Sequence, residues 1–229
     1  MSWGFFDKIY CINLKTRNDR YKACKKLFRK LSIPVHFHRV DKHPISGAQG
    51  CYESHLSIIK DAYDKGYQHI LIFEDDIMTN ERYSTELLQH AFDFMSTNKD
   101  WELFYFGHCP DIMFYKTSNV NKHIMHTYSV LAHAYGVSRR HMEKILNSKH
   151  KEYHGIAIDE IYQNNDHSYA LYPMIFEQNR EVTSDIPTSH PLQGLRFKED
   201  YCYIVNYPIM YWIILLIVIV VILVLFWFF

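Results

Sequence analysis

The stretch His69–Ile77, HILIFEDDI, places four apolar residues directly before three acids, Glu74, Asp75 and Asp76. A short run of β-branched and aromatic side chains predicts a strand that is buried on both faces of a sheet. Three carboxylates are compatible with such a strand only where it leaves the sheet, so we expect them at its carboxyl end. Open α/β sheets bind their ligands at that edge.

The close spacing of these acids indicates a site for a hard metal ion. Carboxylate oxygens suit Mg²⁺ or Mn²⁺, and such ions keep coordination positions open for the phosphates of a substrate. The alternative is a solvated turn that caps the following helix. The local sequence leaves both interpretations open.

Composition and charge narrow the class of protein. The chain has 229 residues, of which 48% are hydrophobic, so it is long enough for one full domain with a sizeable core. The formal net charge is zero, which gives no indication of a nucleic-acid partner. The five cysteines show no CxxC spacing, so neither a disulfide framework nor a zinc site is favoured. We expect reduced thiols in a domain that faces the cytosol.

Strand-like and helix-like periodicities alternate along the chain. Strands are expected at Asp7–Leu14, Val35–Asp41, His69–Asp76, Glu102–Gly107, Leu131–Val137 and Tyr169–Phe176, with a hairpin within Asp111–Ser129. Helices are expected after an N-cap at Thr16, at Tyr52–Tyr63 after a flexible loop with Gly47 and Gly50, at Glu81–Met95, after Ser138, and within Ile156–Gln163. This alternation predicts an α/β fold with a mixed, mostly parallel sheet flanked by helices.

The segment 207–229 is the most apolar part of the chain, and from Ile213 onward it contains no polar residue. Its length is sufficient to span a bilayer, which takes roughly 20 residues. Tyr211 and Trp212 stand where interfacial aromatic residues are usual. We therefore expect a single-pass membrane anchor at the C-terminus, preceded by a domain on the cytosolic side.

A second pair of acids, Asp159 and Glu160, occurs later in the chain and could take part in catalysis. An acidic cluster at a strand end, basic residues near the first βα loop and a later acid pair fit nucleotide-sugar transfer. A divalent ion stabilises a departing diphosphate, and a carboxylate takes the proton from the acceptor hydroxyl. Asp159 and Glu160 are the candidate bases. For Asp159 the alternative is a helix N-cap.

Five motifs in one order resemble glycosyltransferase family 25, which includes lipooligosaccharide and procollagen galactosyltransferases. They are INLKTRNDR, GAQGCYESH, LIFEDDI, AYGVSRRHMEKIL, and IDEIYQNNDHSYALYPMIFEQN with SDI at 184–186. The resemblance implies a GT-A-like fold, a UDP-sugar donor, Mn²⁺ or Mg²⁺, and inversion at the anomeric carbon. The resemblance extends to residue 186, so we expect a catalytic domain at 1–186, with the polar, proline-containing stretch before the anchor as a linker or lid at 187–206.

The resemblance assigns the first group of site residues position by position. Asn13, Arg17 and Arg20 match the amino-terminal motif and would contact the nucleotide. Their alternative is a strand end followed by arginines on a helix surface. Ser54 and His55 match a Ser-His pair that would line the donor pocket. For His55 the alternative is a core histidine bonded to backbone carbonyls.

The resemblance also divides the acids by role. The first or middle acid, Glu74 or Asp75, would lie near the ribose, and Asp76 would bind the metal, with Glu74 as a further metal ligand. His190 is a candidate for the late metal ligand that GT-A enzymes take from their C-terminal region, although no motif of the family covers it.

Asp159 matches the acid of the family's Asp-Glu motif, which favours it over Glu160 as the general base. The resemblance thus implies a hexosyltransferase that moves galactose or glucose from a UDP-sugar to a protein or glycolipid hydroxyl. The alternative is a catalytically inactive, glycosyltransferase-like membrane scaffold or binding protein. A tail-anchored chain of this length suits a large DNA virus or another system that glycosylates at the cytosolic face of a host membrane. No nucleic-acid partner is expected.

Overall fold

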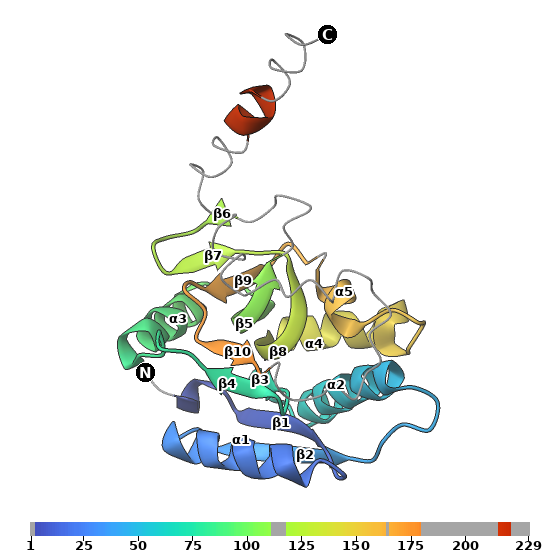
Figure 1. Ribbon diagram of the computed structural model, residues 1–229. Helices are drawn as coiled ribbons and strands as arrows, with labels where there is room; N and C mark the ends of the chain where they lie inside the picture. Colours follow the sequence, from blue (N-terminus) through green and yellow to red (C-terminus); the bar gives the residue numbers. More distant parts are fainter. Residues whose placement is uncertain (1–2, 111–117, 164, 180–214, 221–229) are drawn as a thin grey trace.

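A mixed sheet of eight strands forms the centre of the computed structural model, which describes residues 3–110, 118–163, 165–179 and 215–220 (Figure 1). Its strands are β1 (Lys8–Leu14), β2 (Val35–Val40), β3 (His69–Phe73), β5 (Leu103–Pro110), β6 (Ser118–Asn119), β7 (Ile124–His126), β8 (Ser129–Ser138) and β9 (Ser168–Leu171). A separate two-stranded sheet pairs β4 (Ile77–Thr79) with β10 (Phe176–Gln178).

Across the large sheet the strand order is β2-β1-β3-β8-β5-β9-β7-β6. β1 is parallel to β2 and β3, and β5 is parallel to β9, whereas β8 lies antiparallel between β3 and β5. The strands β2, β1, β3, β5 and β9 therefore share one direction. The prediction of a mixed, mostly parallel sheet flanked by helices is confirmed.

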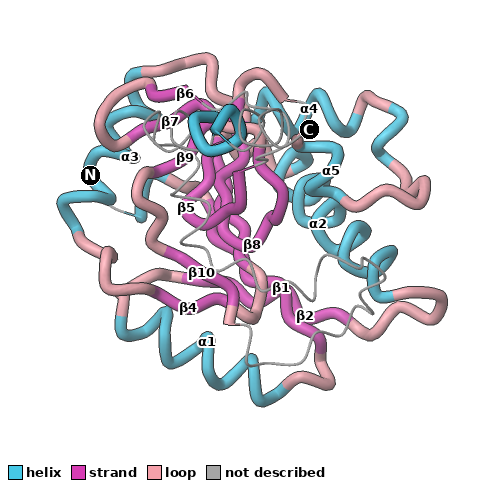
Figure 2. Tube along the Cα trace, turned by 45° about the horizontal axis from the view of Figure 1, so that its top comes forward, coloured by secondary structure: helices cyan, strands magenta, loops and turns pink. Residues whose placement is uncertain are grey.

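Helices cover both faces of this sheet (Figure 2). The helices are α1 (Asn18–Lys30), α2 (Gly47–Asp64), α3 (Thr85–Thr97), α4 (Arg139–Leu146) and α5 (Ile158–Tyr162), with short 3-10 turns at Trp3–Phe5 and Lys149–Lys151. One face packs against α1 and α3, and the other against α2, α4 and α5. β3 contributes Leu71 and Phe73 to the first core and Ile70 and Ile72 to the second, so it is buried on both faces as the sequence predicts.

Helix α1 begins later than the sequence predicts. Its N-cap is Arg17, whose side chain makes no capping hydrogen bond, so the prediction of Thr16 as N-cap is wrong. The Arg17 amide donates to the Leu14 carbonyl at 2.9 Å. Thr16 therefore lies inside the turn that this hydrogen bond closes between β1 and α1.

Helix α2 begins earlier than the sequence predicts, and Gly47 and Gly50 belong to its first turns rather than to a flexible loop. Ser46 is the N-cap, and its hydroxyl accepts a hydrogen bond from a backbone N–H at 3.1 Å. A Cβ atom on Gly50 would lie only 2.7 Å from the His43 Cβ, so close packing of the preceding loop accounts for this glycine. The earlier start places Cys51 on the helix.

The last predicted strand is divided in two. β9 ends at Leu171, and β10 begins at Phe176 and pairs antiparallel with β4 in the small sheet. In that pairing Gln178 stands opposite Ile77, which follows the three acids directly. Within the predicted hairpin, β6 and β7 pair antiparallel, while 111–117 lie outside the described residues.

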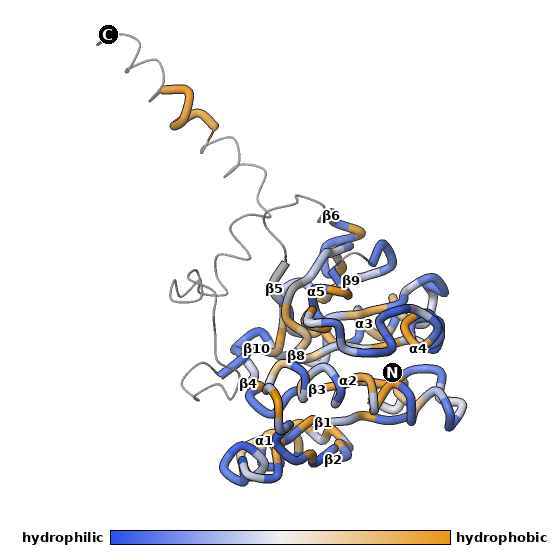
Figure 3. The backbone as a smooth tube through the Cα atoms, turned by 90° about the vertical axis from the view of Figure 1, so that its right-hand side faces the viewer, coloured by the Kyte–Doolittle hydropathy of each residue, from blue (hydrophilic) through white to orange (hydrophobic). Residues whose placement is uncertain are grey.

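Residues 215–220 are helical and apolar (Figure 3). Among the described residues, no helix has both the length and the apolar character needed to span a bilayer. The rest of the predicted anchor, 207–214 and 221–229, and the whole of the predicted linker, 187–206, lie outside the described residues.

We expect Gly50→Ala to destabilise the protein, because its Cβ would overlap with the His43 Cβ, which cannot move without the backbone. Overpacking of this kind costs about 1–3 kcal/mol. The matched control is Lys60→Ala, at an exposed position on the same helix, which should change stability by no more than about 0.5 kcal/mol. Urea unfolding of both variants measures the difference, and equal stabilities would contradict the packing argument.

Candidate functional site

The three acids leave the end of β3 in different directions and meet different partners. Asp75 is buried, and both of its carboxylate oxygens are bonded within the protein. Asn13 Nδ2 donates to one oxygen at 2.6 Å, and Arg20 Nη1 donates to the other at 2.8 Å. The structure therefore brings together Asn13, Arg20 and Asp75, which the sequence assigns separately to nucleotide binding. Since Asp75 is buried against β1 and helix α1, the alternative of a solvated turn is wrong.

Arg17 does not join this ion pair through its guanidinium group. Its Nε and Nη2 donate to the two carboxylate oxygens of Asp19 at 3.1 and 2.9 Å. Its backbone carbonyl accepts a hydrogen bond from Asn13 Nδ2 at 3.2 Å. Arg17 is the N-cap of α1, and its expected contact with the nucleotide stays a prediction.

Glu74 points toward α2 and β10. Its Oε1 lies 3.4 Å from His55 Nε2 and 4.0 Å from Cys51 Sγ, and Gln178 Nε2 donates to Oε2 at 3.4 Å. Burial is the main cause that raises the pKa of Glu74 to about 8, and the charges of Asp159 and Asp75 contribute in the same direction. Glu74 therefore holds its proton more tightly than an ordinary carboxyl group does.

Asp76 lies between this group and the Asp75–Arg20 pair. Arg20 Nη1 is 3.8 Å from its Oδ2, while its Oδ1 is buried without a hydrogen-bond partner among the residues that the structure describes. Burial raises the pKa of Asp76 to about 7, with the charge of Glu74 as the next cause, and Arg20 opposes this shift. The arginine therefore compensates only part of the negative charge at this position.

These features fit a divalent cation. Two neighbouring carboxylates with raised pKa values and one unpartnered buried oxygen form the environment that a bound cation stabilises. Asp76 and Glu74 would supply its oxygen ligands. His190, the other predicted ligand, lies outside the described residues.

Asp159 approaches Glu74 from the first turn of α5, since its charge raises the pKa of Glu74. The N-cap of α5 is Ala157, so the alternative of an N-cap role for Asp159 is wrong. Instead, Asp159 Oδ2 accepts a hydrogen bond from the Leu131 amide at 2.9 Å. Leu131 has a φ of 76°, in the left-handed region that non-glycine residues rarely adopt. Glu160 is exposed, which leaves Asp159 as the acid of this pair that faces the site.

His55 is fully buried, and its partners are side chains rather than the backbone carbonyls of the alternative interpretation. Nδ1 lies 2.7 Å from the Tyr135 hydroxyl, and Nε2 faces Glu74. Burial lowers the pKa of His55 to about 4, so the ring is neutral near pH 7. The neighbouring Ser54 hydroxyl instead donates to the Gly50 carbonyl within α2, at 2.5 Å.

Cys51 and Gln178 are site residues that the sequence analysis missed. A signal for Cys51 exists, because Cys51 and His55 are four positions apart and therefore share one helix face. This spacing carries no weight in the sequence alone, because Gly47 and Gly50 favour a loop that ends just before the predicted helix at Tyr52. Gln178 carries no local signal, since only the pairing of β10 with β4 brings it near Glu74.

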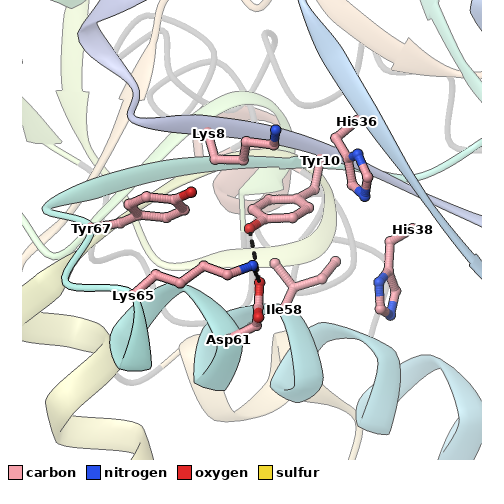
Figure 4. A pocket seen from close by; sticks show the side chains of 8 residues that line it. All are labelled: Lys8, Tyr10, His36, His38, Ile58, Asp61, Lys65 and Tyr67. Carbon is pink, nitrogen blue, oxygen red and sulfur yellow. Dashed lines mark hydrogen bonds and ion pairs between the residues drawn. The ribbon is translucent and has the colours of Figure 1, made fainter.

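A separate cavity of about 340 Å³ lies between α2 and the strands β1 and β2 (Figure 4). Its single acid, Asp61, already accepts hydrogen bonds from Lys65 Nζ at 2.6 Å and from the Tyr10 hydroxyl at 3.3 Å. Lys8, His36, His38, Ile58 and Tyr67 complete its wall. Because Glu74, Asp76 and Asp159 are absent from its lining, this cavity is distinct from the acidic site.

The family model described as Glycosyltransferase family 25 (LPS biosynthesis protein) matches residues 38–162, more than half of the chain. The chain belongs to glycosyltransferase family 25. This confirms the resemblance that the motifs indicate. In this family 25 chain the matched range contains His55, all three acids after β3, and Asp159, whereas Asn13 and Arg20 lie before it.

Individual relatives are more distant. Procollagen galactosyltransferase 2 of Mus musculus is 26% identical over 129 residues, which cover 44% of this chain and 21% of the relative. The Probable inactive glycosyltransferase 25 family member 3 of Rattus norvegicus is 31% identical over 61 residues, covering 27% of this chain and 11% of the relative. The matches to this family 25 chain thus span less than a quarter of either relative.

Among solved structures, the chain is similar to a glycosyltransferase involved in the glycosylation of the major capsid of PBCV-1. The identity is 10%, the match covers 62% of this chain and 68% of the other, and the TM-score is 0.38. A score this low supports no inference about the function of the family 25 chain.

The raised pKa of Glu74 predicts how stability depends on pH without divalent ions. Between its ordinary value of 4.5 and about 8 the folded state keeps a proton that the unfolded state has lost. The free energy of unfolding should therefore fall as pH rises, by at most about 1.4 kcal/mol per pH unit for each retained proton. His55, with a lowered pKa, has the opposite effect below its ordinary 6.5.

We therefore expect stability to fall from pH 6.5 to about 8, and Glu74→Gln should flatten that slope. Urea unfolding in the presence of EDTA measures it. A slope that is the same in wild type and Glu74→Gln would refute the assignment of a raised pKa to Glu74.

We expect Asp75→Asn and Asp76→Asn to have opposite effects on stability at pH 8. Asp75→Asn removes the closer of the two carboxylates that pair with the buried Arg20, and breaking a buried ion pair typically costs about 3–5 kcal/mol. Asp76→Asn removes a desolvated charge and should leave the metal-free protein equally stable or more stable. The two variants serve as controls for each other in urea unfolding. Similar losses in both would mean that Asp75 has no special structural role.

Proposed function

We propose that this family 25 chain is a metal-assisted glycosyltransferase that moves a hexose, galactose or glucose, from a UDP-sugar to a hydroxyl group of a protein or glycolipid. The observation that carries the proposal is that Glu74 and Asp76 follow the carboxyl end of β3, and that Asp159 on α5 is near enough for its charge to act on Glu74. All three lie within the range that matches the family model. The relatives named procollagen galactosyltransferase support galactose.

The acids after β3 would serve the leaving group. Asp76 and Glu74 would hold a divalent ion, Mn²⁺ or Mg²⁺, which when bound supplies positive charge to the diphosphate of the donor. Asp75, Arg20 and Asn13 act on these acids as positioning residues, because their hydrogen bonds fix the backbone between the two outer acids. The roles of Asn13, Arg17 and Arg20 in contacting the nucleotide, and of Ser54 in the donor pocket, stay predictions.

Asp159 would serve the acceptor as general base. The Leu131 amide holds its Oδ2, which fixes the orientation of the carboxylate. In a single displacement the acceptor oxygen bonds to the anomeric carbon as the bond from that carbon to the diphosphate oxygen breaks. Asp159 takes the hydroxyl proton, and UDP leaves with the electron pair. Such a one-step displacement inverts the anomeric carbon.

The second candidate is a scaffold without catalytic activity, which the name of the Rattus norvegicus relative favours. The argument against a scaffold is that the acids of the site reduce the stability of the fold. Partly buried carboxylates with raised pKa values destabilise the fold unless they bind something. A chain that served only as a scaffold would have no physical reason to retain Glu74, Asp76 and Asp159 together. For either candidate, we propose that the apolar segment 207–229 tethers the chain to a membrane with its folded domain in the cytosol.

We expect the purified full-length chain to release UDP from UDP-galactose or UDP-glucose in the presence of Mn²⁺ and not in EDTA. Asp159→Asn should lower the rate by about 10²–10⁴-fold, the usual contribution of a general base, and Asp76→Asn should lower it at least as much. Glu160→Gln is the matched control and should retain activity, because Glu160 is exposed.

Two outcomes would count against this function. Unchanged activity in Asp76→Asn would remove the metal assignment. If no UDP-sugar is turned over and calorimetry finds no Mn²⁺-dependent UDP binding, the scaffold is the better description.

A further inference from the structure

Three side chains that could bind a softer metal converge beside the acids. Cys51 and His55 lie one turn apart on α2, and Glu74 follows β3. Cys51 Sγ and His55 Nε2 lie 4.0 and 3.4 Å from Glu74 Oε1, and the three ligand atoms are all within 4.8 Å of one another. Ligand atoms around one tetrahedral zinc ion are roughly 3.3–3.6 Å apart, given the usual bond lengths. Small side-chain movements would therefore complete the geometry.

The histidine is already held in the orientation that a ligand needs. Its Nδ1 lies 2.7 Å from the Tyr135 hydroxyl, which in turn lies 3.5 Å from the Tyr162 hydroxyl. Histidines that bind metals usually hold their second ring nitrogen in such a hydrogen bond. Because the ring of His55 is fully buried, this contact leaves Nε2 facing Glu74.

The chemistry of these ligands selects the metal. Sulfur and imidazole ligands favour Zn²⁺ over Mn²⁺ and Mg²⁺, which prefer oxygen. Three protein ligands leave a fourth position for water or a substrate, as in zinc sites that are not purely structural. Glu74 is common to both groups of ligands, whereas Asp76 belongs only to the oxygen group.

We propose that Cys51, His55 and Glu74 form a zinc site, and that zinc bound there withdraws Glu74 from the oxygen ligands around Asp76. When zinc binds, the Cys51 S–H bond and the Glu74 carboxyl O–H bond break, both protons pass to solvent, and sulfur–zinc and oxygen–zinc bonds form. Zinc should consequently weaken Mn²⁺ binding. The zinc site itself does not depend on catalysis, whereas its effect on Mn²⁺ rests on the oxygen site of the proposed function.

The test uses the full-length chain stripped of metal with EDTA and titrated with Co²⁺, a spectroscopic substitute for Zn²⁺. We expect a near-ultraviolet charge-transfer band from a cobalt–thiolate bond, which Zn²⁺ abolishes at one equivalent. Cys51→Ser should remove the band and weaken zinc binding by at least about 100-fold, since loss of a residue that merely supports a ligand already costs about 10–100-fold.

Other variants locate the site. Tyr135→Phe should weaken zinc binding by about 10-fold or more and keep the band. Cys24→Ser is the control: this thiol contacts the Asp75 carbonyl rather than Glu74. Its loss should change neither zinc binding nor the cobalt–thiolate band. Asp76→Asn should weaken Mn²⁺ binding but keep zinc binding. Circular dichroism of each metal-free variant confirms folding, and His55→Gln replaces Cys51→Ser if that variant does not fold.

The proposal is overturned if wild type shows no cobalt–thiolate band, or if the band persists in Cys51→Ser. It is also overturned if Asp76→Asn weakens zinc binding as much as the loss of Cys51 does, because a single oxygen site would then bind both metals.

Discussion

The ion pair between Asp75 and Arg20 is the interaction on which the site depends. It joins the end of β3 to α1, and Asn13 at the end of β1 bonds to the same carboxylate. Arg20 and Asp75 are both buried, so each would be strongly destabilising without the other. Because Asp75 is fixed toward α1, Glu74 presents its side chain toward α2, and Asp76 lies at the longer distance of 3.8 Å from the same arginine. The middle acid therefore organises the other two.

The result is that consecutive acids have unequal environments. Glu74 faces a thiol, an imidazole and an amide, whereas Asp76 keeps one oxygen without a hydrogen-bond partner in the described part of the chain. Both carboxyl groups hold protons more strongly than usual, since burial and the negative charges of neighbouring acids disfavour their charged forms. Groups whose pKa values depart this far from the ordinary are common at functional sites. This site thus combines a rigid ion pair with two neighbours suited to binding cations.

Much of the fold could be predicted because its signals are local. The apolar run before Glu74 indicates a buried strand, and the family motifs occur in the order that the fold requires. The errors arose where packing outweighs local preference. Gly50 favours a loop by its own flexibility, but contact with His43 requires a residue without a side chain inside α2. Asp159 is a common type of N-cap, but its carboxylate bonds to Leu131 on a distant strand instead.

By itself, the sequence determined that three acids end a buried strand, that a later acid pair begins a short helix, and that the chain belongs with the glycosyltransferases of family 25. Only the tertiary structure decided which acid is paired with Arg20 and which residues surround Glu74. Cys51, Gln178 and Asp159 reach it from α2, β10 and α5. The proximity of these three residues to Glu74 depends on the strand order and on the antiparallel position of β8. Both arise from contacts between residues far apart in the chain, so no periodic pattern in the sequence reports them.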